Sequence, residues 1–572
     1  MTITAAVPEQ SKTKSAKTKS AKTKSAKTKP ARKVSVRTGK RYRPGRADNH
    51  YDVIVIGSGI GGLTTAALLS LLGKKVCVLE QHYTAGGYTH SYERNGYEWD
   101  VGVHYIGEVH KPYTTLRRVF DVISQSRLKW AEMDPIYDRI LLGDETFDFV
   151  AGRENFIQSL EQAFPEESEA IHKYVNLIRA MSSATPKFFA GQAMPLVMGK
   201  LYNRFRSRLV PKEFYQTTRE VLESLTSNQK LISVLTGQWG DYGQVPSDSA
   251  FFMHALIAKH YLAGGAYPVG GSSDIARTII PTIQASGGEV FTYADVEQVV
   301  VQNNRAVGVR MADGSEIKAA QVVSNAGFMP TINNLLPEDI RKKMGADQWV
   351  EKVQHSSAHL CLYAGFKGST EELGLDTTNL WIYPNGDHEG NVEAFLNDPE
   401  APFPLVYVSF PSAKDPDWEN RYPGKSTVEV VTIVNRDWFE KWQNTTWGQR
   451  GEDYETFKER FAQRMLDELF KHRPQLREPL DFYELSTPLS TRWFQKNEKG
   501  EIYGLDHFLD RFDQPFLHPS TPLKGFYQTG ADVMTAGVGG AMMAGVMTAC
   551  SMQGLRSGRV MKLLKQGVGV TS

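Results

Sequence analysis

The pattern of apolar and polar positions changes at Tyr51, where a long polar stretch gives way to alternating apolar segments. Residues 53–56 form an apolar run typical of a buried strand, residues 63–72 suit an apolar helix, and residues 76–79 repeat the strand pattern. A glycine-rich turn separates the first strand from the helix. This order predicts the first unit of a parallel sheet covered by helices, and therefore an α/β fold.

The turn after the first strand carries a dinucleotide-binding pattern. Its glycines match G-x-G-x-x-G, in which the first allows a tight turn, the second lets backbone approach a diphosphate and the third lets helix and strand pack closely. Glu80 ends the second strand 18 residues after the last of these glycines, where a carboxylate can accept hydrogen bonds from a ribose. We therefore predict cofactor contacts from Gly57, Ser58, Gly59, Gly61, Gly62, Glu80 and Gln81.

The far end of the chain repeats this chemistry and favours FAD over NAD. A strand at 525–529 leads into Asp532, which could hydrogen-bond a ribityl hydroxyl. A second glycine-rich turn and a helix at 541–553 follow, and free N–H groups at a helix start can bind a flavin ring. Two such elements at opposite ends of the chain suit a long cofactor. The predicted contacts in the second turn are Gly537, Gly539 and Gly540.

A third segment connects the two ends. Residues 287–327 alternate as short strands around Asn-Asn and Asp-Gly turns, which is the pattern of antiparallel hairpins. We expect the backbone of Val296 to pair with an adenine edge, and the last strand to rejoin the dinucleotide sheet. An ordinary hairpin without a cofactor contact is the alternative.

These elements together resemble the phytoene desaturase, carotenoid isomerase and retinol saturase group of FAD enzymes, most closely the retinol saturases. The resemblance covers roughly residues 50–572 and is carried by LEQHYTAGG (79–87), NGYEWDVGVHYIG (95–107) and GGSSDIARTIIPTIQASGGEVF (270–291). It implies non-covalently bound FAD, a long apolar polyene substrate and reduction of one carbon–carbon double bond. Gly86 and Gly87 would bring backbone close to the diphosphate. Tyr88 departs from the group, in which many members carry arginine there.

Proton transfer to carbon would need a positioned acid near the flavin. His104, Tyr105 and Glu108 lie just past the strand expected at 97–103, so they are our candidates for this role. A purely structural role for them is the alternative. His82, His90 and His104 have no short metal-ligand spacing, and no metal site is predicted.

The helix-rich remainder is expected to form an inserted α+β substrate domain. The predicted FAD-binding domain is a Rossmann-type parallel sheet assembled from residues 50–150, 286–330 and 521–572, and the substrate domain comprises 151–285 and 331–520. Residues 184–214 mix apolar and basic side chains, as in a helix lying at a membrane surface or in a core helix with a basic edge. The sequence leaves both possibilities open.

The N-terminal segment 1–49 is basic and of low complexity. Residues 1–46 hold 15 Lys and Arg against Glu9, and SAKTK occurs three times in succession, so we expect a disordered tail. Attraction to anionic lipids and a cleaved targeting peptide are alternatives; nucleic-acid binding is not expected, because the tail lacks aromatics and the rest is acidic. Three widely separated cysteines and the lack of a secretory signal suggest a reducing compartment, cytoplasmic or organellar, and not a secreted protein. Because a lipid-soluble substrate would enter from a membrane, we also expect a peripheral membrane protein.

The function predicted from the sequence is FAD-dependent saturation of a double bond in a retinol- or carotenoid-like lipid. Alternatives that use the same flavin site are cis–trans isomerisation or desaturation of a polyene, and chemistry on unsaturated fatty acyl chains. A non-catalytic flavin-binding protein is a further alternative. The chain has no second G-x-G-x-x-G strand–turn–helix unit, so NAD(P)H is expected only as a transient electron donor. The electron donor or acceptor stays open.

Overall fold

The computed structural model describes residues 35–567, so the predictions for the tail up to residue 34 lie outside the described residues. The segment from residue 35 onward corrects part of the tail prediction, because it is ordered into the fold. β1 (Lys40–Arg41) pairs in parallel with β11 (Glu289–Thr292). Thr38 adds two hydrogen bonds, from its N–H to Thr84 Oγ1 (2.9 Å) and from its hydroxyl to the Ala85 carbonyl (3.0 Å).

The dinucleotide sheet has eight strands drawn from both ends and the middle of the chain. Parallel pairing joins β1, β11, β3 (Val76–Leu79), β2 (His50–Ile56), β14 (Glu316–Ser324) and β20 (Phe526–Gln528) in that order. Two antiparallel strands, β12 (Val296–Gln302) and β13 (Arg305–Met311), extend it beside β14. The predicted parallel α/β sheet assembled from discontinuous segments is therefore present.

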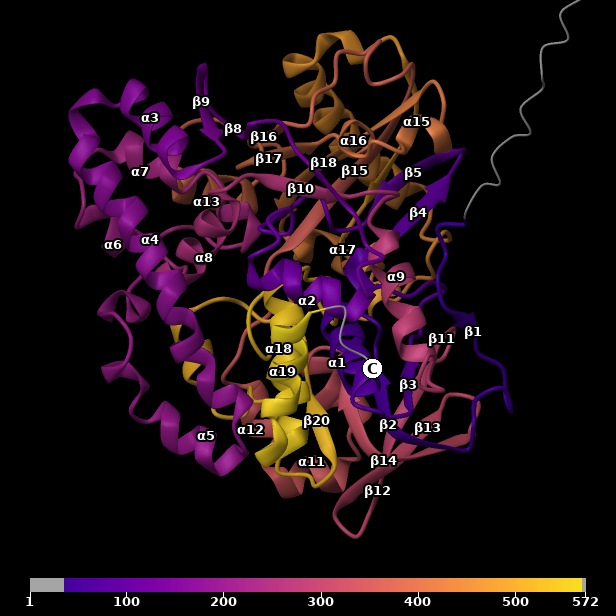
Figure 1. The fold of residues 1–572 in the computed structure, drawn as a ribbon. Coiled ribbons are helices and arrows are strands. Elements are labelled where there is room, and N and C mark those ends of the chain that lie inside the picture. The colour runs from indigo at the N-terminus through magenta and orange to yellow at the C-terminus, as the bar shows by residue number, and fades with distance from the viewer. Residues whose placement is uncertain (1–34, 568–572) are drawn as a thin grey trace, which may run out of the picture. The chain divides into compact units, whose positions relative to one another are not determined.

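Apolar helices cover one face of this sheet. α1 (Ile60–Leu71) lies beside α18 (Gly537–Gln553), so helices near the two ends of the described chain pack together (Figure 1). α2 (Thr115–Ser124) and α9 (Ser273–Gln284) join them in one buried apolar cluster with β2 and β3. A second apolar cluster on other side chains of the same strands includes α11 (Glu338–Met344). Burial of apolar surface on α1 and its neighbours holds the glycine turns in place.

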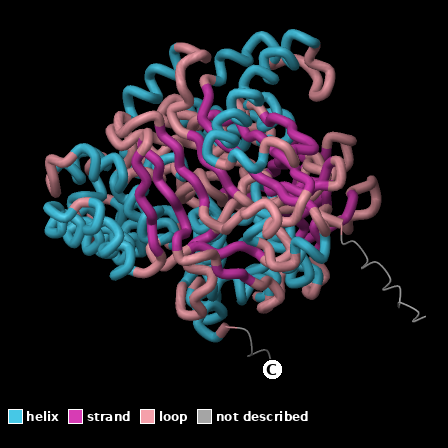
Figure 2. Tube along the Cα trace, turned by 90° about the horizontal axis from the view of Figure 1, so that it is seen from above, coloured by secondary structure: helices cyan, strands magenta, loops and turns pink. Residues whose placement is uncertain are grey.

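A second sheet, of seven strands, forms the part of the fold that lies outside the dinucleotide sheet and its helices. Its order is β19 (Leu480–Ser486), β15 (Ala358–Lys367), β18 (Lys425–Val434), β17 (Val406–Ser409), β16 (Asn379–Tyr383), β8 (Ile136–Leu142) and β9 (Glu145–Val150). Only the β16–β8 pair is parallel. In Figure 2 the strands run between groups of helices. A large cluster of buried apolar residues joins β8, β9 and several helices.

Several helices pack beside this sheet or on one another. They are α3 (Arg153–Ala163), α4 (Ser168–Phe189), α6 (Thr218–Glu223), α7 (Gln229–Leu235) and α8 (Phe251–Tyr261). α5 (Leu196–Asn203) lies away from the sheet, against the 3-10 turn Ala190–Ala193 (Figure 1). α13 (His388–Asn397), α16 (Glu452–His472) and α17 (Pro488–Gln495) follow later in the chain. In the described part of the chain, no helix has the length and apolar composition needed to cross a bilayer.

Two segments lie in a different part of the fold from the one that their place in the sequence suggests. β8 and β9 belong to the seven-stranded sheet, although residues 50–150 were grouped with the dinucleotide-binding domain. α9 packs against α1 and β11, although residues 151–285 were grouped with the substrate domain. A three-stranded sheet of β6 (Ile106–Gly107), β10 (Gly265–Pro268) and β7 (Trp130–Glu132) connects the two regions.

Candidate functional site

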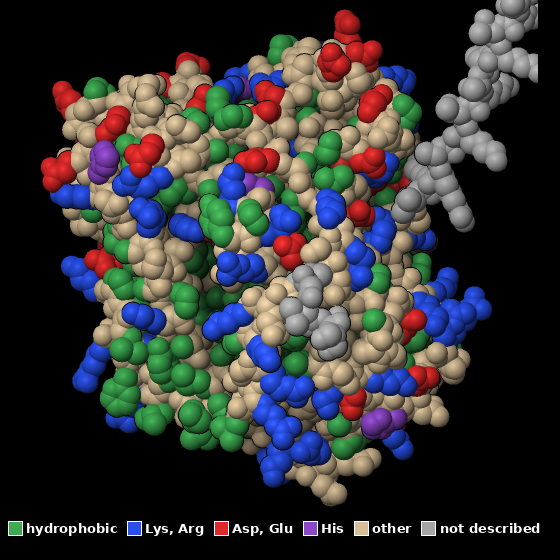
Figure 3. Space-filling view, viewed as in Figure 1, with side chains coloured by type: hydrophobic (Ala, Val, Ile, Leu, Met, Phe, Trp, Pro, Cys, Tyr) green, Lys and Arg blue, Asp and Glu red, His purple; other side chains and the backbone are tan. Residues whose placement is uncertain are grey.

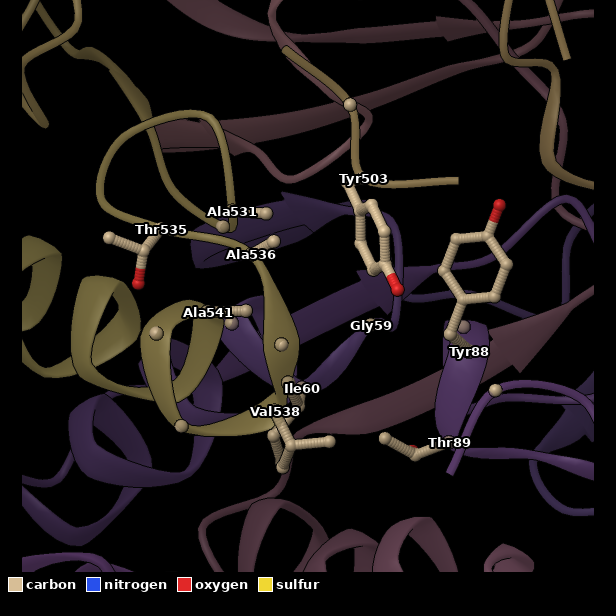
Figure 4. A pocket seen from close by; sticks show the side chains of 18 of the residues that line it. Gly59, Ile60, Tyr88, Thr89, Tyr503, Ala531, Thr535, Ala536, Val538 and Ala541 are labelled. Atoms are coloured by element: carbon tan, nitrogen blue, oxygen red, sulfur yellow. The ribbon is translucent and has the colours of Figure 1, made fainter. Parts of the chain in front are cut away.

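A cavity of about 980 Å³ lies where the dinucleotide sheet meets the second half of the structure. Figure 4 shows three distant segments meeting around it: the start of α1, the loop at Tyr88 and the start of α18. All but two of the predicted site residues line it; Ser58 and Gly62 do not. The lining residues are Gly57, Gly59, Gly61, Glu80, Gln81, Gly86, Gly87, His104, Tyr105, Glu108, Val296, Asp532, Gly537, Gly539 and Gly540.

The first glycine turn is packed so tightly that side chains would not fit. Gly57 adopts a φ of 92°, which favours glycine, and a Cβ on Gly62 would lie 2.3 Å from the Gly57 carbonyl oxygen. A Cβ on Gly61 would lie 2.9 Å from the Ala541 carbonyl oxygen of α18. Gly57, Gly61 and Gly62 therefore allow close packing against neighbouring backbone, and Gly57, Gly59 and Gly61 also line the cavity.

Glu80 binds the backbone of its own site. One carboxylate oxygen accepts hydrogen bonds from the Ser58 N–H (2.9 Å) and hydroxyl (2.7 Å), and the other accepts from the His82 N–H (2.8 Å). The Ser58 hydroxyl in turn accepts from the Gly86 N–H (3.0 Å). Glu80 therefore ties the first glycine turn to the loop that carries Gly86 and Gly87. Ser58 contributes to the site through this bond, which explains why it does not reach the cavity.

The second glycine turn is braced by residues that the sequence left unassigned. The His507 Nε2 accepts from the Ala536 N–H (3.0 Å), directly before α18 begins. Arg511 is buried and donates to the carbonyls of Leu505 and Ala531, both at 2.6 Å. Asp532 accepts from the N–H groups of Phe328 (2.6 Å) and Leu505 (2.8 Å). Its proposed ribityl contact would therefore be additional to a structural role.

His104 lies in a buried network of ionisable groups. Its Nδ1 is 2.7 Å from Glu429 Oε2, and the other oxygen of Glu429 accepts from the Asp100 N–H (2.7 Å). Burial lowers the pKa of His104 to about 4 and raises the pKa of Glu429 to about 8. Burial therefore favours the uncharged form of both His104 and Glu429. The Lys414 ammonium donates to the His104 carbonyl (3.0 Å), and burial lowers its pKa to about 7.

Tyr105 and Glu108 are also committed to protein partners. The Tyr105 hydroxyl donates to Asp138 Oδ2 (2.8 Å), and burial raises its pKa well above the usual range. Its ring stacks on Tyr261 with centroids 4.1 Å apart. Glu108 forms an ion pair with Lys259 of α8. The structure thus brings His104, Tyr105 and Glu108 to one cavity, and their roles in proton transfer stay predictions.

The part of the cavity beyond the glycine turns has an apolar wall. Met253, Leu256 and Ile257 of α8 line it together with Met543 and Met547 of α18. Thr185 and Pro186 of α4 add to this wall. The sequence did not point to Met253, Leu256 or Ile257, because their apolar pattern is that of any core helix. Glu429 and Lys414 were missed for a similar reason, since each lies more than 300 residues from His104.

Comparison with known proteins agrees with this geometry. Residues 60–553 match the family described as flavin containing amine oxidoreductase. The chain belongs to this family. The all-trans-retinol 13,14-reductase of Danio rerio is 35% identical over 534 residues, covering 89% of this chain and 86% of that protein. The resemblance stated from the sequence is confirmed, and so is an oxidoreductase fold that binds FAD.

Other similar proteins carry names that indicate different activities. A Danio rerio protein named inactive all-trans-retinol 13,14-reductase is 34% identical, covering 90% of this chain and 87% of that protein. Chloroplastic prolycopene isomerase of Daucus carota is 28% identical, covering 79% and 72%. The structure of putrescine oxidase bound to putrescine has a TM-score of 0.58 at 14% identity, covering 88% of this chain and 99% of that one. This last likeness concerns the fold.

The cradle observed here fits the flavin cofactor. Two glycine-rich helix starts, at α1 and α18, border the same cavity, where their glycines expose backbone beside the side chains of Ile60 and Val538. Helix N-termini carry free N–H groups and favour negative charge, as a diphosphate requires. Tyr88 lines the cavity at the position where many members of the resembling group carry arginine. Because tyrosine offers no positive charge there, the diphosphate would depend on backbone N–H donors from the two glycine turns.

Proposed function

We propose that this FAD-dependent oxidoreductase saturates one carbon–carbon double bond of a long apolar polyene, such as a retinol- or carotenoid-like lipid. The observation that carries the proposal is that a single cavity joins the two cofactor turns to the apolar wall of α8 and α18. The all-trans-retinol 13,14-reductases, similar over most of the chain, support the same reaction class. FAD, when bound, supplies hydride transfer to carbon.

The chain's own residues would have distinct tasks around that chemistry. The starts of α1 and α18 would hold the diphosphate and the flavin by backbone N–H groups, and Glu80 would bind ribose while bracing Ser58. Val296, at the start of β12, would present backbone to the adenine. The apolar wall would orient the polyene and exclude water, which keeps transferred protons under the control of nearby groups such as His104, Tyr105 and Glu108.

A second candidate function is isomerisation of a polyene. The similarity to prolycopene isomerase favours it, because the same apolar cavity would suit a carotenoid. The masses of the products separate the candidates when FAD-loaded protein is incubated anaerobically with a chemical reductant and a polyene. A gain of two hydrogens supports the saturase. Unchanged mass with a shifted absorption spectrum supports an isomerase, and a loss of two hydrogens with an added oxidant supports a desaturase.

We also propose that the protein works at a membrane surface on the reducing side of the cell. α5 and the turn after it expose Val197, Met198, Leu201, Phe205 and Leu209, which are 47–80% exposed. Lys200, Arg204 and Arg208 are exposed among them, and Figure 3 shows this apolar and basic surface, which we call the α5 surface. Apolar side chains with a basic rim suit an anionic lipid interface.

Only part of residues 184–214, the segment proposed to lie at a membrane surface, is exposed in the structure. Phe188 and Phe189, which were counted with residues 184–214, are buried core residues. Arg206 is also buried, with its guanidinium 4.0 Å from the centre of the Phe188 ring, and it is ion-paired with Asp513. Phe188, Phe189 and Arg206 therefore agree with the alternative that residues 184–214 form part of the core. The exposed α5 surface agrees with the alternative that part of this segment lies at a membrane surface.

Flotation with liposomes tests the membrane proposal. Replacing Val197, Met198 and Leu201 by serine should reduce co-flotation with vesicles that contain anionic phospholipid, because the exposed apolar area is lost. Leu555→Ser is the matched control, since Leu555 is 95% exposed but lies outside the α5 surface. Equal flotation of the triple variant and the wild type would contradict the proposal.

A further inference from the structure

One carboxyl oxygen of the cavity lining, on Asp241, has no hydrogen-bond partner among the described residues. Asp241 ends a short 3-10 turn (Trp239–Asp241) and lines the cavity, and its Oδ2 is buried without a hydrogen-bond partner among the described residues. A buried polar atom left unpaired costs about 1–3 kcal/mol, so such a group indicates a missing ligand or solvent molecule.

Other carboxyl groups of the cavity are already occupied. Glu80 accepts three hydrogen bonds from Ser58 and His82, Asp532 accepts two from backbone N–H groups, and Glu108 is paired with Lys259. Asp295 also lines the cavity, but it is exposed to solvent. Among the carboxyl groups that line the described cavity, Asp241 is therefore the one with a buried oxygen that has no hydrogen-bond partner.

The surroundings of Asp241 fix its position and favour its neutral form. Tyr503 donates to the Gly240 carbonyl (2.8 Å), and the flanking Trp239 and Tyr242 are buried. Burial raises the pKa of the neighbouring Asp138, although the hydrogen bonds that it accepts from Asn379, Tyr105 and Gln238 act in the opposite direction. Burial raises the pKa of Asp241 well above its usual range, and the negative charge of Asp138 adds to this effect. Hydrogen bonding with the Tyr105 side chain acts in the opposite direction and lowers the pKa.

A neutral carboxyl group both donates and accepts, which matches the hydrogen-bonding pattern of an alcohol. A hydrocarbon end placed against it would leave both capacities unused. We propose that Asp241 is a specificity-determining residue, which binds a hydroxyl group on the polyene and so makes the cavity prefer a polyene alcohol to the corresponding hydrocarbon. This inference rests on the proposed function, because it takes the ligand of the cavity to be a polyene.

His359 offers an internal comparison. Its Nδ1 is also buried without a partner, and it lines the same cavity from β15. However, Asp241 lies close to the stacked rings of Tyr105 and Tyr261, which border the α8 wall. Asp241 is thus placed to meet an end group of a ligand lying along that wall, and His359→Leu becomes the matched variant for the test.

The test measures dissociation constants of FAD-loaded protein for all-trans-retinol and for its analogue with methyl in place of hydroxymethyl, by quenching of tryptophan fluorescence. Wild type should bind the alcohol about tenfold more tightly, since one satisfied buried hydrogen bond has that effect. Asp241→Leu should bring the ratio near one with the flavin spectrum unchanged, Asp241→Asn should keep part of the preference, and His359→Leu should keep all of it.

Two results would overturn the assignment. One is equal affinity of the wild type for the two polyenes, and the other is loss of the preference in His359→Leu but not in Asp241→Leu. Reoxidation of the chemically reduced, FAD-loaded wild type by these polyenes tests the proposed function separately. If both polyenes reoxidise the flavin and bind equally well, only the role of Asp241 fails. If neither binds nor reoxidises it, the proposed function and the role of Asp241 fail together.

Discussion

Single residues in the site serve the fold and the cofactor at once. The sequence predicted a ribose contact for Glu80 from its distance to the glycine turn. The structure adds that Glu80 already accepts three hydrogen bonds from Ser58 and His82. Each carboxylate oxygen has more than one acceptor site, so a ribose contact remains compatible with these bonds. No local pattern in the sequence could have indicated the bracing role.

Substitution of Glu80 should therefore affect both cofactor retention and stability. Glu80→Gln places an amide NH2 where one carboxylate oxygen accepts, so it faces a backbone N–H as a second donor. We expect loss of roughly 1–3 kcal/mol of stability and a lower FAD-to-protein ratio after gel filtration. Glu297→Gln is the control, because Glu297 forms only an exposed ion pair with Arg310. A full complement of FAD in Glu80→Ala, which has no side-chain acceptor, would disprove the ribose contact.

The pair formed by His104 and Glu429 makes stability depend on pH. The pKa of Glu429 is raised by burial to about 8, so the folded state holds its proton more tightly than the unfolded state. This contribution is complete below the unfolded pKa, near 4.5, and is lost as the pH rises through about 8. Its partner residue is 325 positions away, which is why the sequence could name His104 but not Glu429.

Glu429→Gln isolates that contribution, because glutamine resembles the protonated acid and does not titrate. The stability of the variant relative to wild type should increase as the pH rises from about 5 to 8. Urea unfolding midpoints of both proteins at several pH values in this window provide the measurement. Lys414, with its pKa lowered to about 7 by burial, is coupled to Glu429, whose charge raises that pKa, so the difference between the two proteins reports Glu429 together with this coupling. A difference that stays constant across the window would contradict the assignment.

At the scale of elements, local patterns were most informative where a segment is both apolar and bounded by glycine. The strand predicted at 76–79 agrees with β3, and the helix predicted from residue 63 begins at Ile60, inside the glycine turn. The sequence did not predict a helix start at Ile60, because glycines are poor helix formers in isolation. In the structure Gly61 and Gly62 are helical, and α1 packs closely against α18 there. The strand predicted at 97–103 ends at Asp100, which faces Ser272 and Tyr267 instead of the cavity.

The basic segment before β2 divides into two parts with different expected roles. Deletion of residues 1–34 should leave the melting temperature unchanged, whereas deletion of residues 1–46 should lower it. The longer deletion removes β1 and the hydrogen bonds that Thr38 and Tyr42 make with Thr84, Ala85 and Thr292. Thermal unfolding of the two truncated proteins tests this, and equal melting temperatures would show that β1 adds nothing to stability.

At the scale of the described chain, the site exists only because distant segments meet. The dinucleotide sheet takes strands from residues 40 to 528, and α1 and α18 place their glycine starts at one cavity. The sequence could predict these end pieces, since each carries its own motif. It could not place β8, β9 or α9, because their apolar patterns suit either half and only long-range packing decides between them.

Cofactor binding should therefore stabilise the whole described fold and not one segment of it. FAD that binds only the folded state adds about 2.7 kcal/mol when its free concentration is 100 times the dissociation constant. We expect the melting temperature to fall when FAD is removed and to recover in one cooperative transition when it is added back. NAD is the matched control, because it lacks the flavin that α18 should hold, so it should give a much smaller shift. A shift with NAD as large as that with FAD would mean that α18 does not contact the cofactor.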